Sequence, residues 1–157
     1  MTRIRPFTLA IPQSQIDDLH ARIDAARWPE KETVDDWSQG TPLDALQDFV
    51  SYWRNEYDWR RCEARLNGLG QFITEIQGLD IHFLHVRSAQ PDALPLVITH
   101  GWPGSVIEFM GVIDELANPA DGGQAFHVVA PSLPGFGFSG KPTGTGWGVG
   151  KIGLAWG

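Results

Sequence analysis

The fold class rests on one segment, Leu94-Pro95-Leu96-Val97-Ile98-Thr99-His100-Gly101-Trp102-Pro103-Gly104-Ser105. Its first half is a continuous apolar run, which is typical of a strand covered on both faces of a sheet. Its second half is rich in glycine and proline and predicts a tight turn. Ser105 and Glu108 have the spacing of a capping box, which marks the start of a helix. The segment therefore predicts a buried strand, a tight bend and a helix.

The flanking segments extend this pattern. Residues 71–77 and 81–86 alternate with a period of two around Gly78-Leu79-Asp80 and predict a β-hairpin. Residues 127–130 form a further short apolar strand after the helix. Because strands and a helix alternate along the chain, we expect a parallel sheet with covering helices, which is the α/β class.

The first part of the chain has helical periodicity. Apolar residues recur at spacings of three and four after Ser14 and again after Thr41-Pro42. We expect Ser14 and Thr41 to cap these two helices, with Pro42 at the first helical position. A shorter helical segment follows. The pattern predicts a helical region, residues 1–67, and a sheet-forming region, residues 68–157.

Composition excludes several classes of function. The chain has 157 residues and a net charge of −7, so nucleic acid is not an expected partner, because phosphate binding needs a basic surface. The single cysteine, Cys62, allows no intrachain disulfide and favours a cytoplasmic location. No segment approaches the roughly 20 apolar residues of a membrane span, and the first residues lack the apolar core of a signal peptide.

The bend at residues 100–105 has a pattern suited to chemistry. In open α/β sheets, ligands bind at the carboxyl ends of strands, and this bend directly follows one. Its glycines allow close approach of the backbone, and its N–H groups can point at a developing oxyanion. A structural strand-to-helix turn explains the same six residues equally well.

Other motifs fail on their context. Residues 135–140 and 148–153 match G-x-G-x-x-G, but neither directly joins a strand to a helix, as a dinucleotide site requires. Pro142 stands where a P-loop needs a hydroxyl. The chain has no G-x-[Ser/Cys/Asp]-x-G nucleophile elbow and no zinc-binding pattern, so we expect no cofactor and no metal. His82 and His85 lie on opposite faces of one predicted strand and are interpreted as ordinary strand residues.

Several separated motifs resemble one enzyme family. The segment from His100 to Ser105, followed by Glu108-Phe109, resembles the HGWPGS…EF segment of microsomal and juvenile-hormone epoxide hydrolases. Residues 131–139 resemble the P-S-L-P-G-[FY]-G-[FW]-S loop of the same family. Trp28-Pro29, the Trp37 region, Tyr52-Trp53, Tyr57-Asp58-Trp59 and Leu66-Asn67 resemble its N-terminal region. The resemblance implies an incomplete α/β-hydrolase sheet preceded by a helical region.

The resemblance also implies a mechanism and site residues. In this family an Asp attacks an epoxide, two tyrosines hold the epoxide oxygen, and a His-activated water cleaves the resulting ester to give a diol. It implies that the Trp102 N–H is an oxyanion-hole donor, that Gly101 and Pro103 shape the turn, and that the Trp102–Pro103 bond is cis. His100 is expected to support the bend structurally, while Phe136 and Trp102 line the pocket for a small hydrophobic epoxide.

The chain departs from the family pattern in one respect. The nucleophilic Asp, the tyrosines, the His and its acidic partner have no counterpart in it, so we expect a truncated epoxide hydrolase that is inactive alone. It would self-associate or pair with a missing C-terminal segment, and in the complete enzyme it would serve detoxification. The alternatives are a non-catalytic binding module and part of another α/β-hydrolase, such as an esterase or haloalkane dehalogenase.

Overall fold

The computed structural model describes residues 3–157, which form two compact units. The sheet unit contains the described residues up to Leu9 together with Glu63–Gly157. The helical unit contains Ala10–Cys62. The chain passes from the sheet unit to the helical unit after Leu9 and returns to the sheet unit after Cys62. The division between residues 67 and 68 stays a prediction. The first residues return to the sheet unit because they pair with a strand there.

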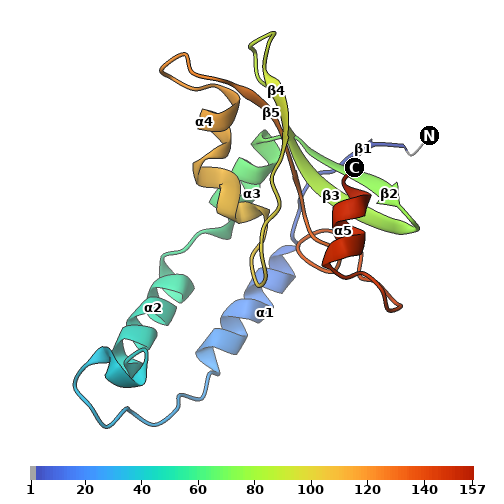
Figure 1. The fold of residues 1–157 in the computed structure, drawn as a ribbon. Coiled ribbons are helices and arrows are strands. Elements are labelled where there is room, and N and C mark those ends of the chain that lie inside the picture. The colour runs from blue at the N-terminus through green and yellow to red at the C-terminus, as the bar shows by residue number, and fades with distance from the viewer. Residues whose placement is uncertain (1–2) are drawn as a thin grey trace. The chain divides into compact units, whose positions relative to one another are not determined.

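The sheet unit contains a five-stranded sheet (Figure 1). Its strands are β1 (Arg5–Pro6), β2 (Gln71–Ile76), β3 (Leu79–Val86), β4 (Leu94–Val97) and β5 (Phe126–Pro131), in the spatial order β1-β2-β3-β5-β4. The predicted hairpin is confirmed as β2 and β3, which pair with Phe72 opposite Phe83. Its turn has Gln77 and Gly78 at positive φ, as a two-residue hairpin turn requires.

The α/β class is confirmed, and the sheet is mixed, because the expected parallel pairing is joined by antiparallel pairs. β4 and β5 are parallel, with Leu96 opposite Val128. The other pairs, β1–β2, β2–β3 and β3–β5, are antiparallel. The physical reason is that a hairpin joins β2 to β3, and a hairpin forces antiparallel pairing, whereas β4 and β5 are joined by a helical crossover.

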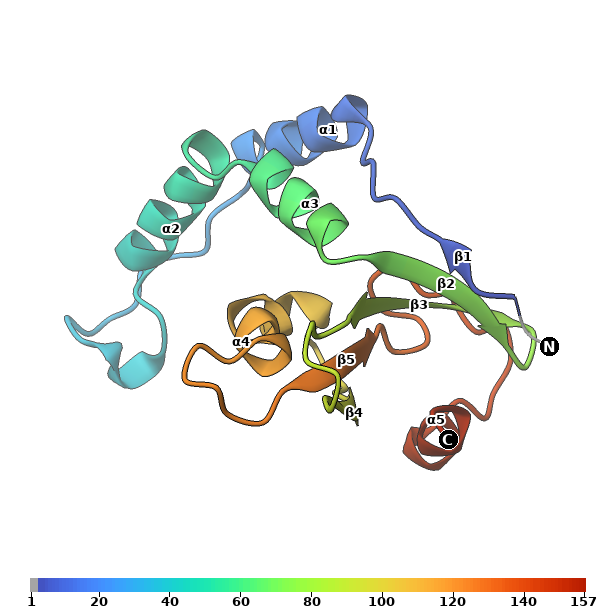
Figure 2. The same ribbon diagram turned by 90° about the horizontal axis from the view of Figure 1, so that it is seen from above.

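Helical segments cover both faces of this sheet (Figure 2). The crossover consists of the 3₁₀ helix η2 (Val106–Gly111) and helix α4 (Ile113–Ala117), and α4 contacts β3 and β5. Helix α5 (Val149–Ala155) lies on the opposite face. The largest fully buried apolar side chains are Leu66, Ile81, Leu84, Val106, Ile113 and Val128. The core of the chain therefore lies between the sheet and its covering helices.

The helical unit contains α1 (Gln13–Asp24), the 3₁₀ helix η1 (Trp37–Gln39), α2 (Leu43–Asn55) and the start of α3 (Trp59–Gly68). The guanidinium of Arg54 on α2 donates two hydrogen bonds to the carboxylate of Asp24 at the end of α1, at 2.8 and 2.9 Å. Arg54 holds the pKa of that carboxyl below its usual value, mainly through this hydrogen bond. These two hydrogen bonds therefore link α1 to α2, which are connected along the chain by a long exposed segment.

The predicted caps of α1 and α2 are wrong. Pro12 and Pro42 occupy the N-cap positions, and neither helix receives a side-chain cap from its N-cap residue. Ser14 lies inside α1. At α2 the Glu32 carboxylate accepts the Leu43 N–H at 2.9 Å. Glu32 thus provides the side-chain cap that was expected from Thr41. Glu32 is eleven residues away from Leu43, so the local sequence pattern could not predict this cap.

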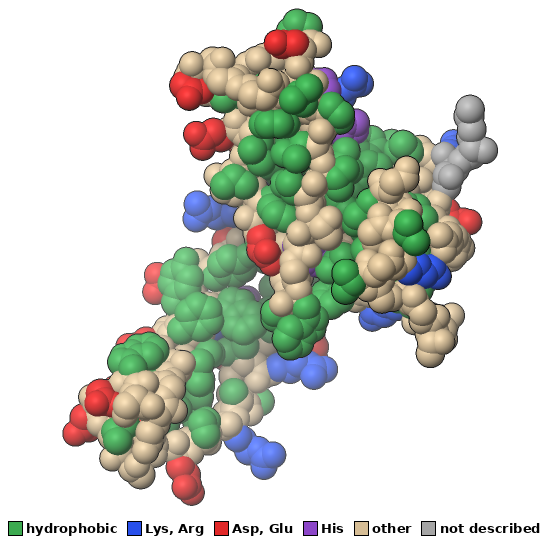
Figure 3. Space-filling view, in the orientation of Figure 1, with side chains coloured by type: hydrophobic (Ala, Val, Ile, Leu, Met, Phe, Trp, Pro, Cys, Tyr) green, Lys and Arg blue, Asp and Glu red, His purple; other side chains and the backbone are tan. Residues whose placement is uncertain are grey.

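None of residues 10–62, all of which the structure describes, is buried. The apolar stripe of α2 is instead partly open to solvent, because Leu46 and Trp53 are more than a third exposed, and Phe49 and Tyr52 beside them are more than half exposed. Figure 3 shows hydrophobic side chains at the surface over α1 and α2. No helix among the described residues has the length and apolar character that crossing a lipid bilayer demands.

Candidate functional site

The predicted bend lies directly after β4, at the carboxyl end of a parallel strand. The Trp102–Pro103 peptide bond is cis, as the family resemblance implied. The Gly104 N–H donates to the Gly101 carbonyl at 2.7 Å and closes the turn. The sequence thus placed this turn correctly.

The side chain of His100 is buried beneath the rest of the bend, and both of its ring nitrogens have hydrogen-bond partners. Its Nε2 accepts the backbone N–H of Leu133 at 3.1 Å. Because an amide N–H can only donate, the ring proton lies on Nδ1, which faces the Gly101 carbonyl oxygen at 3.2 Å. His100 therefore supports the bend from below and ties it to the loop that follows β5.

These contacts orient the peptide group between Gly101 and Trp102. The Gly101 carbonyl oxygen accepts from both Gly104 and His100. In a planar trans peptide the N–H points opposite to the C=O, so the Trp102 N–H points away from these donors. Among residues 3–157 the Trp102 N–H has no hydrogen-bond partner. The bend therefore presents one fixed and available donor.

The residues after the bend hold it at the start of η2. The Ser105 hydroxyl accepts the Ile107 N–H, and the Glu108 carboxylate accepts the Ser105 N–H at 3.1 Å, which confirms the predicted capping box. A Cβ at Gly104 would overlap the carboxylate of Glu108. A side chain at this position would therefore displace the capping carboxylate.

Of the two predicted pocket residues, Trp102 belongs to the bend and Phe136 lies close to it. The ring of Phe136 makes an edge contact with His100, with 5.9 Å between ring centroids. The Trp102 side chain is 82 % exposed, and it does not line either of the two cavities described below. The structure therefore brings Phe136 to the bend through His100, while Trp102 extends into solvent.

A buried polar cluster lies beside this site, and sequence reasoning missed it. His82 on β3 has its Nδ1 2.9 Å from the Ser132 hydroxyl and its Nε2 3.0 Å from the Gln71 carboxamide oxygen. The Gln71 amide nitrogen donates to Asn67, so its oxygen accepts and His82 Nε2 donates. Burial lowers the pKa of His82 to about 4. His82 is a neutral, fully bonded histidine rather than an ordinary strand residue.

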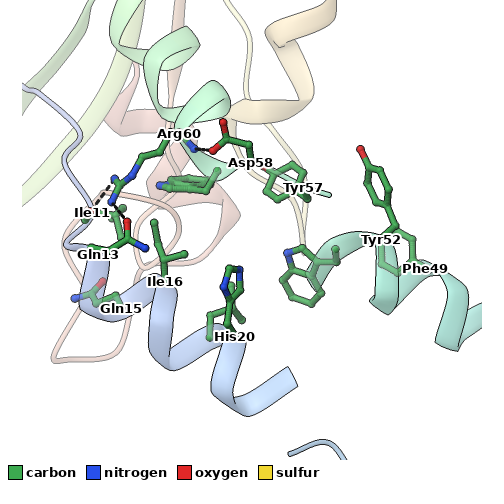
Figure 4. Close-up of a pocket in the computed structure, with 13 residues that line it drawn as sticks. Ile11, Gln13, Gln15, Ile16, His20, Phe49, Tyr52, Tyr57, Asp58 and Arg60 are labelled. Atoms are coloured by element: carbon green, nitrogen blue, oxygen red, sulfur yellow. Dashed lines mark hydrogen bonds between the residues drawn. The ribbon is translucent and has the colours of Figure 1, made fainter. Parts of the chain in front are cut away.

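The larger cavity lies in the helical unit (Figure 4). It is an open groove of about 930 Å³ between α1, α2 and the start of α3. Its walls are mainly apolar, and at one end Arg60 donates to the Ile11 carbonyl and the Gln13 side chain. A smaller cavity of about 170 Å³ lies under α5 against the face of the sheet. Neither cavity contains a residue of the bend.

The described residues hold no group of three or more His, Cys, Asp or Glu side chains arranged to bind a metal ion. At the bend, the structure presents the Trp102 amide, with His100 bonded to the carbonyl of the same peptide group and Phe136 in contact with His100. Such an amide can stabilise a negative charge that develops on a substrate oxygen.

Comparison with known proteins points to one family. The family model described as epoxide hydrolase N terminus matches residues 4–109, and the model described as alpha/beta hydrolase fold matches residues 95–151. A protein of Stigmatella aurantiaca named as a candidate epoxide hydrolase is 58 % identical over 98 % of the chain. Epoxide hydrolase 1 of Oryctolagus cuniculus is 40 % identical over 87 % of the chain.

Solved structures agree with this result. An enantioselective mutant of the Aspergillus niger epoxide hydrolase matches with a TM-score of 0.84 and 36 % identity, over 97 % of this chain and 41 % of that one. The juvenile hormone epoxide hydrolase of Bombyx mori matches with a TM-score of 0.86 and 33 % identity, over 99 % of this chain and 42 % of that one. The chain spans 36 % of the Stigmatella relative and 32 % of the rabbit relative. Because the matching model covers more than half of its residues, the chain belongs to the epoxide hydrolase N-terminus family.

Proposed function

We propose that this chain forms the N-terminal part of an epoxide hydrolase, in which the Trp102 N–H is one donor of the oxyanion hole. The observation that carries the proposal is the orientation of the Gly101–Trp102 peptide group, whose carbonyl is held by two donors and whose N–H is available. In α/β-hydrolases one oxyanion donor comes from this loop and the other from the residue after the nucleophile.

The donor acts in the second half of the reaction. Opening of the epoxide by a carboxylate leaves an alkyl–enzyme ester, and attack of water on the ester carbon places negative charge on its oxygen. A preorganised N–H stabilises that charge without reorientation, and such a donor contributes about 3 kcal/mol. Gly101 and Pro103 shape the turn, and His100 holds its carbonyl side. The nucleophile, the base and the tyrosines belong to the part that the relatives have beyond the matched region.

The names of the relatives and the Phe136 ring beside His100 support a substrate class. We assign a small hydrophobic epoxide, which Phe136 and the Trp102 ring contact when the rest of the pocket is present. A cytoplasmic location, expected from the single cysteine, and a role in detoxification remain predictions.

The groove of the helical unit fits a role in assembly. Its helices carry an apolar stripe with no buried residue, and such a surface is stable when protein covers it. We assign this cover to the segment that makes up the other two thirds of the relatives. The alternative is a non-catalytic module that binds a different partner. A monodisperse, cooperatively unfolding monomer on size-exclusion chromatography would favour such a module.

A chimera tests the catalytic proposal. Residues 1–157 replace the matching segment of the Stigmatella relative, and styrene oxide hydrolysis is measured for the chimera and for this chain alone. We expect turnover by the chimera and none by the chain. Replacement of the Trp102 amide by a backbone ester removes the donor and keeps the side chain, so kcat should fall about 100-fold or more.

The matched control is the same ester replacement at Val149, which is exposed at the start of α5, where a helix N–H has no intrahelical partner. It should retain kcat. Turnover by the chain alone, or an unchanged kcat with the ester at Trp102, would overturn the proposal.

A further inference from the structure

His82 anchors the start of the loop that follows β5. Its Nδ1 accepts from the Ser132 hydroxyl, because its Nε2 proton is used by Gln71. The backbone repeats the link, since the Ser132 N–H donates to the His82 carbonyl at 2.8 Å. Both side chains are fully buried. Ser132 is therefore held to β3 by its side chain and by its main chain.

A second serine closes the same cluster. The Ser139 hydroxyl donates to the Ser132 carbonyl at 2.7 Å and accepts the His82 N–H at 3.0 Å. A Cβ at Gly137 would come within 3.0 Å of the Ser132 hydroxyl oxygen, so the loop folds tightly over it. The loop from Ser132 to Ser139 is thus fixed to His82 at both ends.

The next residue of the loop reaches the bend. Leu133 follows Ser132 directly, and its N–H is the donor to His100 Nε2. His100 in turn faces the Gly101 carbonyl. A displacement of Ser132 would move the Leu133 N–H, and with it the ring that holds the peptide group before Trp102.

We propose that His82 is a positioning residue for the oxyanion donor and acts through Ser132, Leu133 and His100. This inference rests on the proposed function, because it assigns the Trp102 N–H a catalytic role. His82 itself touches neither the bend nor any residue that we place in contact with substrate. Its part is to provide one acceptor, at Nδ1, in a fixed place beneath the loop.

Two substitutions of His82 separate positioning from packing. Asn places a side-chain oxygen near the position of Nδ1 and keeps an acceptor for Ser132. Gln places its amide near Nε2, keeps the donor to Gln71 and leaves the Ser132 hydroxyl without its acceptor. In the chimera, His82→Asn should retain kcat within about threefold, whereas His82→Gln and Ser132→Ala should lose about tenfold or more, each with KM nearly unchanged.

His85→Gln is the matched control, because His85 lies on the same strand with its side chain on the opposite face. It should retain kcat. A purely structural role predicts instead that kcat follows the melting temperature and that His82→Asn loses as much as His82→Gln. Equal kcat values for these two variants, whether high or low, would overturn the proposal.

A measurement on the 157-residue chain separates failure of this inference from failure of the proposed function. Amide exchange of Leu133, followed by nuclear magnetic resonance, should be at least about tenfold faster in His82→Gln than in His82→Asn. Equal exchange rates in the two variants would overturn the link between His82 and the Leu133 N–H, even if the chimera is active. An inactive chimera with unequal exchange rates would overturn the catalytic role and leave the link intact.

Discussion

At the scale of single residues, two buried histidines organise the sheet unit. His82 and His100 each donate from one ring nitrogen and accept at the other. The ring holds these two positions at a fixed separation, so each histidine connects segments that are distant in sequence. His82 must stay neutral for this, because protonation would convert its acceptor nitrogen into a donor.

Neutrality of His82 makes stability depend on pH. Burial lowers its pKa from 6.5 to about 4, and its side-chain neighbours Gln71, Ser132, Phe7 and Phe138 are not ionisable. Between these two values the unfolded chain binds a proton that the folded chain does not. The stability from His82 is thus complete above pH 6.5 and declines as pH falls towards 4, by about 3 kcal/mol in total.

Urea unfolding at pH 7 and pH 4.5 measures this effect. The free energy of unfolding of the parent chain should decrease more between these pH values than that of His82→Asn, which cannot take up the proton. The same decrease in both proteins would show that His82 does not carry the pH dependence.

At the scale of elements, the cap at the start of η2 depends on the space that one glycine leaves free. Glu108 caps the helix only because Gly104 leaves room for its carboxylate. A methyl group at Gly104 would displace that carboxylate from the Ser105 N–H, at the helix start that follows the bend.

A double-mutant cycle tests this dependence. Glu108→Ala and Gly104→Ala should each destabilise the chain by about 1 kcal/mol, the usual effect of losing a cap. In the double mutant the second change should cost much less, because the carboxylate is already gone. Gly111→Ala is the control, since a Cβ there meets nothing within 4 Å. Additive effects in unfolding experiments would refute the steric link.

At the scale of the whole molecule, the two units differ in how much they bury. The sheet unit has a core of fully buried side chains, whereas no residue from 10 to 62 is buried. Helices with little buried apolar surface open readily, because most of the stability of a helix in a protein comes from packing.

Hydrogen exchange should reveal this difference. In the 157-residue chain, amides of α1 and α2 should exchange at least about 100-fold faster than those of β3 and β5. In the chimera the helices should gain protection, because the added segment covers the groove. Equal protection of α2 in both proteins would contradict the proposed cover.

Much of the fold was predictable because its signals are local. The β2–β3 hairpin, the strand before the bend and the capping box at Ser105 each depend on residues that lie close together in the sequence, and the structure confirms them. The helix caps at Ser14 and Thr41 were wrong because prolines and the distant Glu32 took their place. Periodicity predicted the apolar stripe of α2 but could not show that no other part of the described chain buries it.

The chain's local patterns and motifs were sufficient to establish its class, its family and the turn in which we propose the oxyanion donor, because backbone geometry at glycine and proline is set within a few residues. The folded chain alone decided which way the Trp102 N–H points and what holds it there. The reason is physical: His82 meets Ser132 only when β3 and β5 pair, and His100 meets Leu133 only when β4 and β5 pair, so these hydrogen bonds exist only in the folded sheet.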